Sequence, residues 1–189
     1  MTSLIDQPKL IVFVGSSIMA LWESLPRFFP EMPVLNTAVS GSQTHEIYAR
    51  LDELVLPFAP SAVCYYCGSN DIDHDVPART IVENVTRSYE TLHQRLEGLT
   101  FIYLSIIKAP QKMDRWDRVE DVNFQLSQLS SGSAGFHFVD INPVFFASDG
   151  TPRMDFYEQD QLHLTPTAYV ALGEYLAPKV MALVRESRE

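Results

Sequence analysis

The sequence predicts an α/β fold, in which a single domain spanning residues 1–189 forms a three-layer α/β/α sandwich with about five parallel strands. Two observations predict this class. Short apolar runs rich in β-branched and aromatic residues alternate with longer segments whose apolar residues recur at helical spacing. The apolar runs are also continuous rather than interrupted by polar residues, which is typical of strands buried on both faces of a parallel sheet.

The apolar runs give the expected strands, which cover residues 10–14, 34–39, 62–67, 101–107 and 136–141. The helical spacing gives the expected helices, which cover residues 18–29, 45–56, 78–96, 119–129 and 166–184. The last helix has a clear start, because Thr165 supplies a capping hydroxyl and Pro166 suits the first helical position. No internal repeat, low-complexity segment or linker marks a second domain, so 189 residues are expected to fold around one core.

The composition is that of an ordinary globular protein, with 46% hydrophobic and 20% charged residues. Acidic residues outnumber basic ones by 24 to 14, which gives a formal net charge of −10. A surface of this sign repels phosphate backbones and anionic lipids, which argues against nucleic acid and against a membrane as partners. Residues 1–10 lack the basic start and apolar run of a signal peptide, so we expect a cytoplasmic location. The oligomeric state is not specified, and a homo-oligomer stays open.

Cys64 and Cys67 are the two cysteines of the chain, and their C-x-x-C spacing raises the question of a redox or zinc site. They fall in a run that predicts a buried strand, on which residues three apart point to opposite faces. No second cysteine pair or nearby histidine completes a set of metal ligands. We therefore expect two core cysteines and no metal site.

An acid and a histidine lie three residues apart, at Asp160 and His163, just before the last helical segment. A carboxylate at that spacing can orient an imidazole from a single loop. Ser17 lies far upstream, where the first strand turns into the first helix. A serine on a strand-to-helix turn and an oriented histidine are the groups that nucleophilic acyl transfer needs.

Four polar or small-residue loops, at residues 16–17, 40–42, 68–71 and 160–163, each follow a predicted strand. In a parallel α/β sheet such loops gather at the carboxyl edge of the strands, where ligands bind. Taken alone, a serine there can be a helix cap and Gly-Ser-Asn-Asp a turn. Taken together, the four loops indicate one hydrolytic site.

The same loops resemble the four conserved blocks of the SGNH hydrolases, the GDSL-type esterases, lipases and acylhydrolases. The blocks read Gly-Ser-Ser-Ile at 15–18, Asn-Thr-Ala-Val-Ser-Gly at 36–41, Gly-Ser-Asn-Asp at 68–71 and Asp-Gln-Leu-His at 160–163. Their order and spacing and the total length match, so the resemblance covers essentially the whole chain. It implies a flavodoxin-like sandwich fold.

The resemblance also implies site residues. Ser17 would be the nucleophile, His163 its base and Asp160 the acid that orients the histidine. The backbone N–H groups of Ser17 and Gly41 and the side-chain amide of Asn70 would form the oxyanion hole. The implied substrate is a small-molecule ester, and the chemistry needs no metal or organic cofactor.

Two positions depart from the family pattern. Ser16 stands where the first block usually has aspartate, which leaves two adjacent serines to choose between; alignment on the glycine favours Ser17. Ala38 stands where the second block often has glycine, and its methyl group should narrow the floor of the site slightly.

Four further residues are expected to border the substrate pocket: His74, Arg115, Trp116 and Tyr157. For Trp116, packing against the following helix is the alternative. His74 belongs to an acidic run, residues 71–75, that lacks the glycine and glutamate of a calcium-binding loop. We expect this run to be a solvated acidic loop.

The sequence thus favours cleavage of carboxylic esters through an acyl-enzyme intermediate. Short acyl groups such as acetyl are favoured because no long lid or extended apolar insertion is visible. Thioester hydrolysis and carbohydrate deacetylation would use the same triad and stay open. Two non-catalytic alternatives are a flavodoxin-like anion-binding module, in which residues 15–17 cradle an anion, and a degenerate hydrolase kept as an interaction module. The first leaves Asp160 and His163 without a role.

Overall fold

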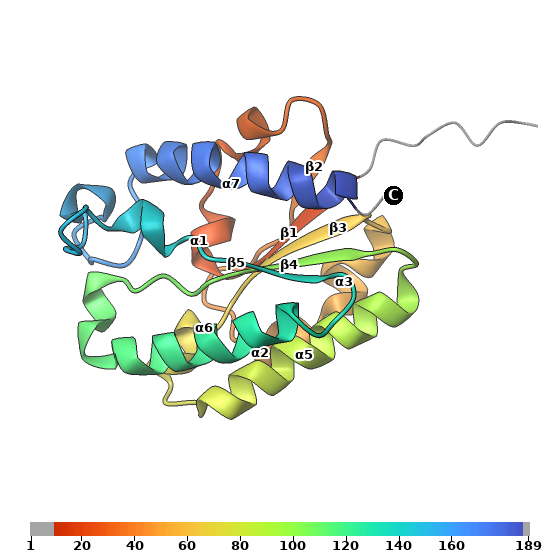
Figure 1. Cartoon of the computed structure of the whole chain (residues 1–189), viewed down its shortest axis with the longest axis horizontal. Coiled ribbons are helices and arrows are strands. Elements are labelled where there is room, and N and C mark those ends of the chain that lie inside the picture. The colour runs from red at the N-terminus through yellow and green to blue at the C-terminus, as the bar shows by residue number, and fades with distance from the viewer. Residues whose placement is uncertain (1–9, 187–189) are drawn as a thin grey trace, which may run out of the picture.

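The computed structural model of the chain describes residues 10–186, and Figure 1 shows them as one twisted sheet between layers of helices. Five parallel strands pair in the order β2-β1-β3-β4-β5. They are β1 (Ile11–Gly15), β2 (Val34–Asn36), β3 (Ala62–Tyr66), β4 (Thr100–Leu104) and β5 (Phe136–Val139). Each strand overlaps one of the five apolar runs, so the predicted fold class is confirmed.

The α-helices are α1 (Ser17–Ala20), α2 (Thr44–Ala49), α3 (Leu51–Leu54), α4 (Ser69–Asp73), α5 (Ala78–Arg95), α6 (Trp116–Ser130) and α7 (Pro166–Glu186). Short 3-10 turns are η1 (Leu25–Phe28), η2 (Leu56–Phe58), η3 (Pro110–Arg115), η4 (Asn142–Phe145) and η5 (Met154–Phe156). Helices α1 and α7 cover one face of the sheet, and α2, α3, α5 and α6 cover the other. Within the described residues, no helix combines the length and the apolar character that crossing a membrane requires.

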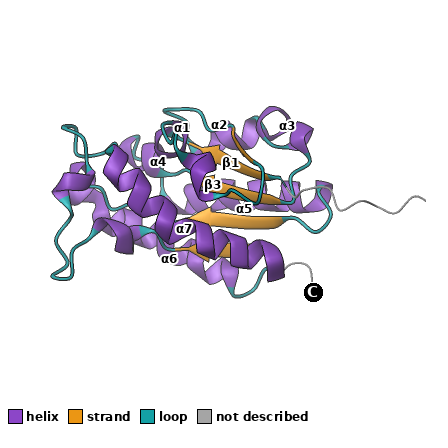
Figure 2. Cartoon of the chain, turned by 90° about the horizontal axis from the view of Figure 1, so that it is seen from above, coloured by secondary structure: helices purple, strands orange, loops and turns teal. Residues whose placement is uncertain are grey.

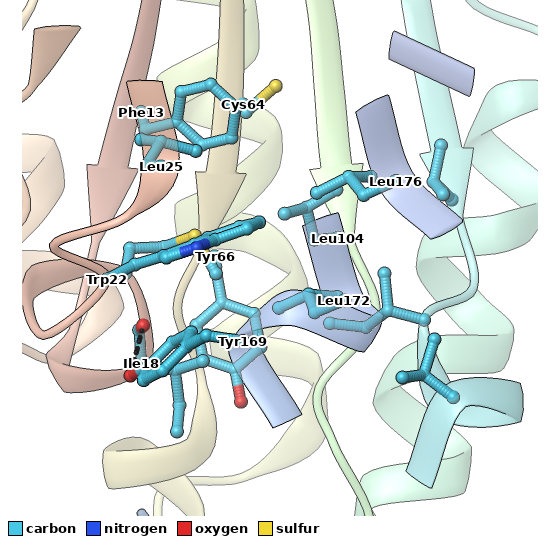
Figure 3. Packing of buried hydrophobic residues seen from close by; sticks show 14 of the residues in the cluster. Phe13, Ile18, Trp22, Leu25, Cys64, Tyr66, Leu104, Tyr169, Leu172 and Leu176 are labelled. Carbon is cyan, nitrogen blue, oxygen red and sulfur yellow. Dashed lines mark hydrogen bonds between the residues drawn. The ribbon is translucent and has the colours of Figure 1, made fainter. Parts of the chain in front are cut away.

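Alternate residues of β1 face the two helical layers. Phe13 packs in the cluster that contains α1 and α7, whereas Val12 packs in the cluster with α2 and α5. Phe13 meets Trp22 edge-on, and Trp22 stacks on Tyr169 of α7 with ring centroids 5.7 Å apart (Figure 3). Burying one large apolar side chain stabilises a fold by about 1.5–3 kcal/mol. This aromatic stack therefore holds α7 against the segment between α1 and η1.

The cysteines are core residues, as expected. Cys64 and Cys67 are free and fully buried. Cys64 packs in the cluster on the α7 side and Cys67 in the cluster on the opposite side. Their sulfur atoms therefore diverge, which is the physical reason that the C-x-x-C spacing forms neither a disulfide nor a ligand pair.

The continuous helix expected over residues 18–29 is wrong. Helix α1 ends at Ala20, and the separate turn η1 follows. Pro26 lies at the start of η1. Its missing N–H and its ring, which would clash with the carbonyl oxygen of Trp22, prevent one helix from running through this segment.

The helix expected over residues 45–56 is interrupted as well. It divides into α2 and α3 at Arg50, whose φ of −114° departs from helical geometry. Ile47 and Leu51, two of the residues that predicted the helix, are nevertheless buried. Apolar spacing specified the buried face of this segment, not its continuity.

The solvated acidic loop expected at residues 71–75 is also wrong. Most of this stretch belongs to helix α4, Asp71 has no exposed surface, and Asp73 forms an ion pair with the buried Lys112. The stretch folds inward because the backbone N–H and the hydroxyl of Thr44, a residue far away in the sequence, satisfy the buried Asp71 carboxylate.

The strand order creates a natural binding position. Strand β1 has β2 on one side and β3 on the other, so the direction of winding reverses between β1 and β3. Ligands of open α/β sheets bind outside the carboxyl ends of the strands at such a point. Figure 2 shows the strands running toward the end of the molecule where α1 and α4 lie. Residues 1–9, which include most of the N-terminal stretch discussed above, lie outside the described residues.

Candidate active site

The turn between β1 and α1 requires glycine at its corner. Gly15 has φ of +149°, and a Cβ on it would lie 1.8 Å from the carbonyl oxygen of Tyr66 in β3. That carbonyl accepts the N–H of Ser16, the N-cap of α1. The close approach of β3 places Ser17 at the first position of α1, at the carboxyl edge of the sheet.

Ser17, His163 and Asp160 form a hydrogen-bonded chain. Ser17 Oγ lies 3.1 Å from His163 Nε2, although 146 residues separate them in the sequence. His163 Nδ1 lies 2.5 Å from Asp160 Oδ2. Ser16 is 1% exposed and its hydroxyl caps no helical N–H. Of the two adjacent serines, the structure therefore brings Ser17 to the histidine.

The loop that carries the acid and the histidine organises itself locally. Asp160 Oδ1 accepts the backbone N–H groups of Leu162, at 3.0 Å, and of His163, at 2.9 Å. Gln161, the residue after Asp160, has φ of +58°, and its carbonyl oxygen accepts the N–H of Gln111 from η3. These contacts hold the loop although the side chains of His163 and Asp160 remain 33% and 49% exposed.

The same contacts determine the charge of the Asp160 carboxyl group and the tautomer of the His163 ring. Burial alone would raise the pKa of Asp160, but the hydrogen bonds from the His163 ring and from the two backbone N–H groups outweigh it and lower the pKa to about 2. An ionised carboxylate only accepts hydrogen bonds, so His163 Nδ1 carries the proton in this pair. In the neutral imidazole Nε2 is then an acceptor, and the Ser17 hydroxyl can donate to it.

Three candidate hydrogen-bond donors lie on the segments that follow β1, β2 and β3. Ser17 itself is the first residue of α1, where N–H groups have no acceptor within the helix. Gly41 has φ of +82° and lies on the loop before α2. Asn70 is in α4, and its Nδ2 donates to the carbonyl oxygen of Ser42 at 2.9 Å. One of its two amide hydrogens makes that bond, which leaves the second for a ligand.

The sequence model of the GDSL-like Lipase/Acylhydrolase family matches residues 13–171, which include every residue of this arrangement. The chain belongs to the GDSL-like lipase/acylhydrolase family. The resemblance to the SGNH hydrolases is thereby confirmed, and the chain is placed among hydrolases that act on esters.

Relatives of known identity agree with this assignment. The human platelet-activating factor acetylhydrolase IB subunit alpha1 is 24% identical over 192 residues, which cover 97% of this chain and 80% of the relative. A GDSL-like lipase from Bacteroides thetaiotaomicron superposes with a TM-score of 0.76 at 18% identity, covering 95% of this chain and 93% of that chain. An acetylxylan esterase from Geobacillus stearothermophilus superposes with a TM-score of 0.73 at 16% identity, covering 93% and 94%. At these identities the solved structures show the shared fold.

The four residues expected to border the pocket of this GDSL-like protein have differing surroundings. His74 Nδ1 lies 2.8 Å from the carbonyl oxygen of Asn70, and Arg115 Nη1 donates to the carbonyl oxygen of Asp73 at 3.1 Å, so both border α4. Trp116 donates its indole N–H to Ala109 and packs edge-on against Phe146. Tyr157 is 6% exposed and packs in the core against Phe145. Among the described residues, none of the four hydrogen-bonds to Ser17, His163 or Asp160.

A hollow of about 320 Å³ lies on the histidine side of the site. Leu21, one helical turn after Ser17, and Leu164, next to His163, both line it. So does Glu158, whose N–H donates to the carbonyl oxygen of His163. Its full lining is Leu21, Glu23, Ser24, Glu158, Leu164, Pro166 and Tyr169. Its wall combines apolar residues with the carboxylates Glu23 and Glu158, and Ser17 and His163 are not among its lining residues.

Two residues that sequence reasoning missed connect the loops of the site. Asp71 and Thr44 are both completely buried and hydrogen-bonded to each other. Thr44 carried a usable signal, since it precedes an apolar-spaced segment where a helix should start. Asp71 ends the Gly-Ser-Asn-Asp block at 68–71, but its position in an acidic run suggests exposure rather than burial.

Proposed function

We propose that the chain is a serine esterase that cleaves carboxylic esters, with Ser17, His163 and Asp160 as its catalytic triad. The observation that carries this proposal is the hydrogen-bonded chain from Ser17 Oγ through the His163 ring to Asp160. The three groups come from two ends of the sequence and stand in the order that nucleophile, base and orienting acid require. Membership of an acylhydrolase family supports the same conclusion.

Acylation would start with attack of Ser17 Oγ on the ester carbonyl carbon. The hydroxyl proton passes to His163 Nε2, because a neutral hydroxyl is a poor nucleophile. The ionised Asp160 stabilises the imidazolium that forms. His163 then gives the proton to the departing alkoxide as the ester C–O bond breaks, which releases the alcohol and leaves an acyl-enzyme. Water, activated by the same imidazole, releases the acid and restores Ser17.

The tetrahedral intermediate places a negative charge on the former carbonyl oxygen. The N–H groups of Ser17 and Gly41 and the free amide hydrogen of Asn70 are the donors that we assign to this oxygen. A helix N-terminus adds the positive end of its dipole. Removing one donor of this kind typically lowers kcat by roughly 10²–10³-fold.

Short acyl esters, acetyl esters above all, are the substrates that we propose. A hollow of about 320 Å³ is near the lower end of the roughly 300–1,000 Å³ that ligand pockets span. Two relatives, an acetylhydrolase and an acetylxylan esterase, are named for acetyl esters. The second name also makes the acetyl groups of a carbohydrate the second candidate substrate, through the same triad.

Steady-state hydrolysis of p-nitrophenyl esters of increasing acyl length tests this proposal, with acetyl-CoA and an acetylated xylo-oligosaccharide assayed alongside. We expect saturable turnover that is fastest with acetate, and loss of turnover in Ser17→Ala. A higher kcat/KM for the octanoate would overturn the short-acyl assignment, and a higher value for the thioester would overturn the ester assignment. Preference for the oligosaccharide would establish the second candidate. Absence of any saturable hydrolysis would support an anion-binding or interaction module instead.

A further inference from the structure

Asp71 is a buried carboxylate beside the proposed oxyanion donor Asn70. Its side chain is fully buried, and within residues 10–186 it forms no ion pair with a lysine or arginine. Both of its oxygens instead accept the backbone N–H of Thr44, at 3.1 and 3.0 Å, and Oδ1 also accepts the Thr44 hydroxyl at 2.5 Å. Burying a carboxylate is unfavourable unless such donors satisfy it. Thr44 therefore supplies the hydrogen bonds that satisfy the Asp71 carboxylate.

Thr44 also forms a hydrogen bond to a third helix, α5. It is the first residue of α2 and is fully buried. Its Oγ1 accepts the side-chain amide of Asn84 from α5 at 3.1 Å. Because an ionised Asp71 can only accept, the direction of each bond is fixed: Asn84 donates to Thr44, and Thr44 donates to Asp71. The chain of bonds ties α5, α2 and α4 together.

Two members of this chain of bonds, Asp71 and Thr44, lie close in sequence to the proposed oxyanion donors. Asp71 follows Asn70 in α4, and Thr44 lies three residues after Gly41. Between them, the carbonyl oxygen of Ser42 accepts the Asn70 amide. The loop before α2 is thus attached to α4 at two points, Asn70–Ser42 and Asp71–Thr44. Two attachments fix the orientation of one segment on another, which a single hydrogen bond does not.

We propose that Asp71 is a positioning residue, which acts through Thr44 to hold the Gly41 N–H and the Asn70 amide at the separation that the oxyanion requires. The inference rests on the proposed esterase function. Asp71 touches no reacting atom in this role. Its contribution is made when charge develops on the carbonyl oxygen, so it should act on kcat rather than on KM.

Kinetics of four variants with p-nitrophenyl acetate, each well below its own Tm, test the proposal. Asp71→Asn replaces an acceptor oxygen by a donor that faces Thr44. Thr44→Val removes the hydroxyl and keeps the shape, whereas Thr44→Ser keeps the hydroxyl. Tyr89→Phe is the matched control, because it removes a hydrogen bond between distant segments, from the Tyr89 hydroxyl to the carbonyl oxygen of Ala134.

We expect Asp71→Asn and Thr44→Val to lower kcat by about 10- to 100-fold, since a misplacement near 1 Å has an effect of that order. KM should change little, and Thr44→Ser should restore most of kcat. Tyr89→Phe should lower Tm and leave kcat unchanged. If Asp71→Asn does not fold, the Thr44 pair decides the question.

Three results would overturn the positioning role: an effect confined to KM, a Thr44→Ser variant as slow as Thr44→Val, or a loss of kcat in Tyr89→Phe as large as in Asp71→Asn. The wild-type protein separates this failure from a failure of the proposed function. A wild type that hydrolyses the ester while Asp71→Asn and Thr44→Val match its kcat overturns the positioning role alone. A wild type that hydrolyses no ester overturns both.

Discussion

Two aspartates of the site, Asp160 and Asp71, are held in opposite ways. Asp160 is half exposed and takes its partners from two residues close behind it in the sequence, Leu162 and His163. Asp71 is fully buried and takes its partner from a residue 27 positions away, Thr44. The hydrogen bonds lower the pKa of Asp160 to about 2, whereas burial raises the pKa of Asp71 above its ordinary value against the opposing bonds from Thr44.

The difference separates two structural tasks. A carboxylate that orients one neighbouring ring needs only a short loop of defined shape, and such a loop can stay in contact with solvent. The two oxyanion donors that we propose, at Gly41 and Asn70, lie on separate segments and would need the packing of whole helices to align them. In our proposal this alignment uses the buried hydrogen bonds that join α2, α4 and α5, together with the bond from Asn70 to Ser42 on the loop before α2. The following four predictions test this division.

The largest expected effect is the loss of kcat when the half-exposed carboxylate, Asp160, is replaced. Asp160→Asn should lower kcat for an acetyl ester by about 10⁴-fold, as loss of the acid of a triad leaves the histidine in the wrong tautomer. At neutral pH the free energy of unfolding should fall only modestly, because solvent screens the contribution of this half-exposed carboxylate. Kinetics and thermal unfolding of the same preparation check both statements. A fall of less than tenfold would mean that another group orients His163.

The next largest effect is expected on stability, at Gly15 in the buried turn between β1 and α1. Gly15→Ala should destabilise the fold by more than about 4 kcal/mol, because its Cβ would overlap the backbone of Tyr66 and the φ of +149° disfavours alanine. Chemical denaturation measures the loss. Gly132→Ala is the control, since among the described residues other than Gly132 and its two chain neighbours no atom lies within 4 Å of the added Cβ. Equal stability of the two variants would show that the turn can relax.

The two aspartates should also differ in the sign of their pH dependence. The pKa of Asp160 is lowered, so its stabilising contribution is present above the unfolded value of about 3.9 and is lost as the pH falls through about 2. The pKa of Asp71 is raised, so its contribution is present below about 3.9 and is lost as the pH rises through its folded value.

Unfolding free energies of the wild type, Asp160→Asn and Asp71→Asn across pH therefore give two difference curves. Wild type minus Asp160→Asn should rise between about pH 2 and 4. Wild type minus Asp71→Asn should fall as the pH rises from about 4. Two curves with the same sign would contradict the contrast between the two carboxylates.

The smallest effect is expected at Ser16. Ser16→Ala should leave kcat and Tm almost unchanged, because the hydroxyl caps no N–H of α1 and Ser17, not Ser16, contacts His163. Ester kinetics and thermal unfolding measure the outcome. Loss of activity in this variant would transfer the role of nucleophile to Ser16.

The sequence predicted the sheet and the residues around Ser17 because both leave local signals. Continuous apolar runs such as 62–67 specify strands buried on two sides, and Asp160 and His163 stand close enough in sequence to be recognised together. The break in residues 18–29 was readable from Pro26, whose restriction on helices outweighs apolar spacing. The burial of Asp71 was not readable, because it depends on Thr44 and Asn84, which approach only when three helices pack. Pocket residues also depend on non-local packing, and Tyr157 lies in the core for that reason.

Intact-protein mass after exposure to a fluorophosphonate tests the central claim most directly, with wild type, Ser16→Ala, Ser17→Ala and His163→Ala treated side by side. The proposed triad predicts one phosphonate adduct on the wild type and on Ser16→Ala, and none on Ser17→Ala or His163→Ala. An adduct that persists on Ser17→Ala, or a wild type that gains none, would contradict the assignment of Ser17 as the nucleophile of a serine esterase.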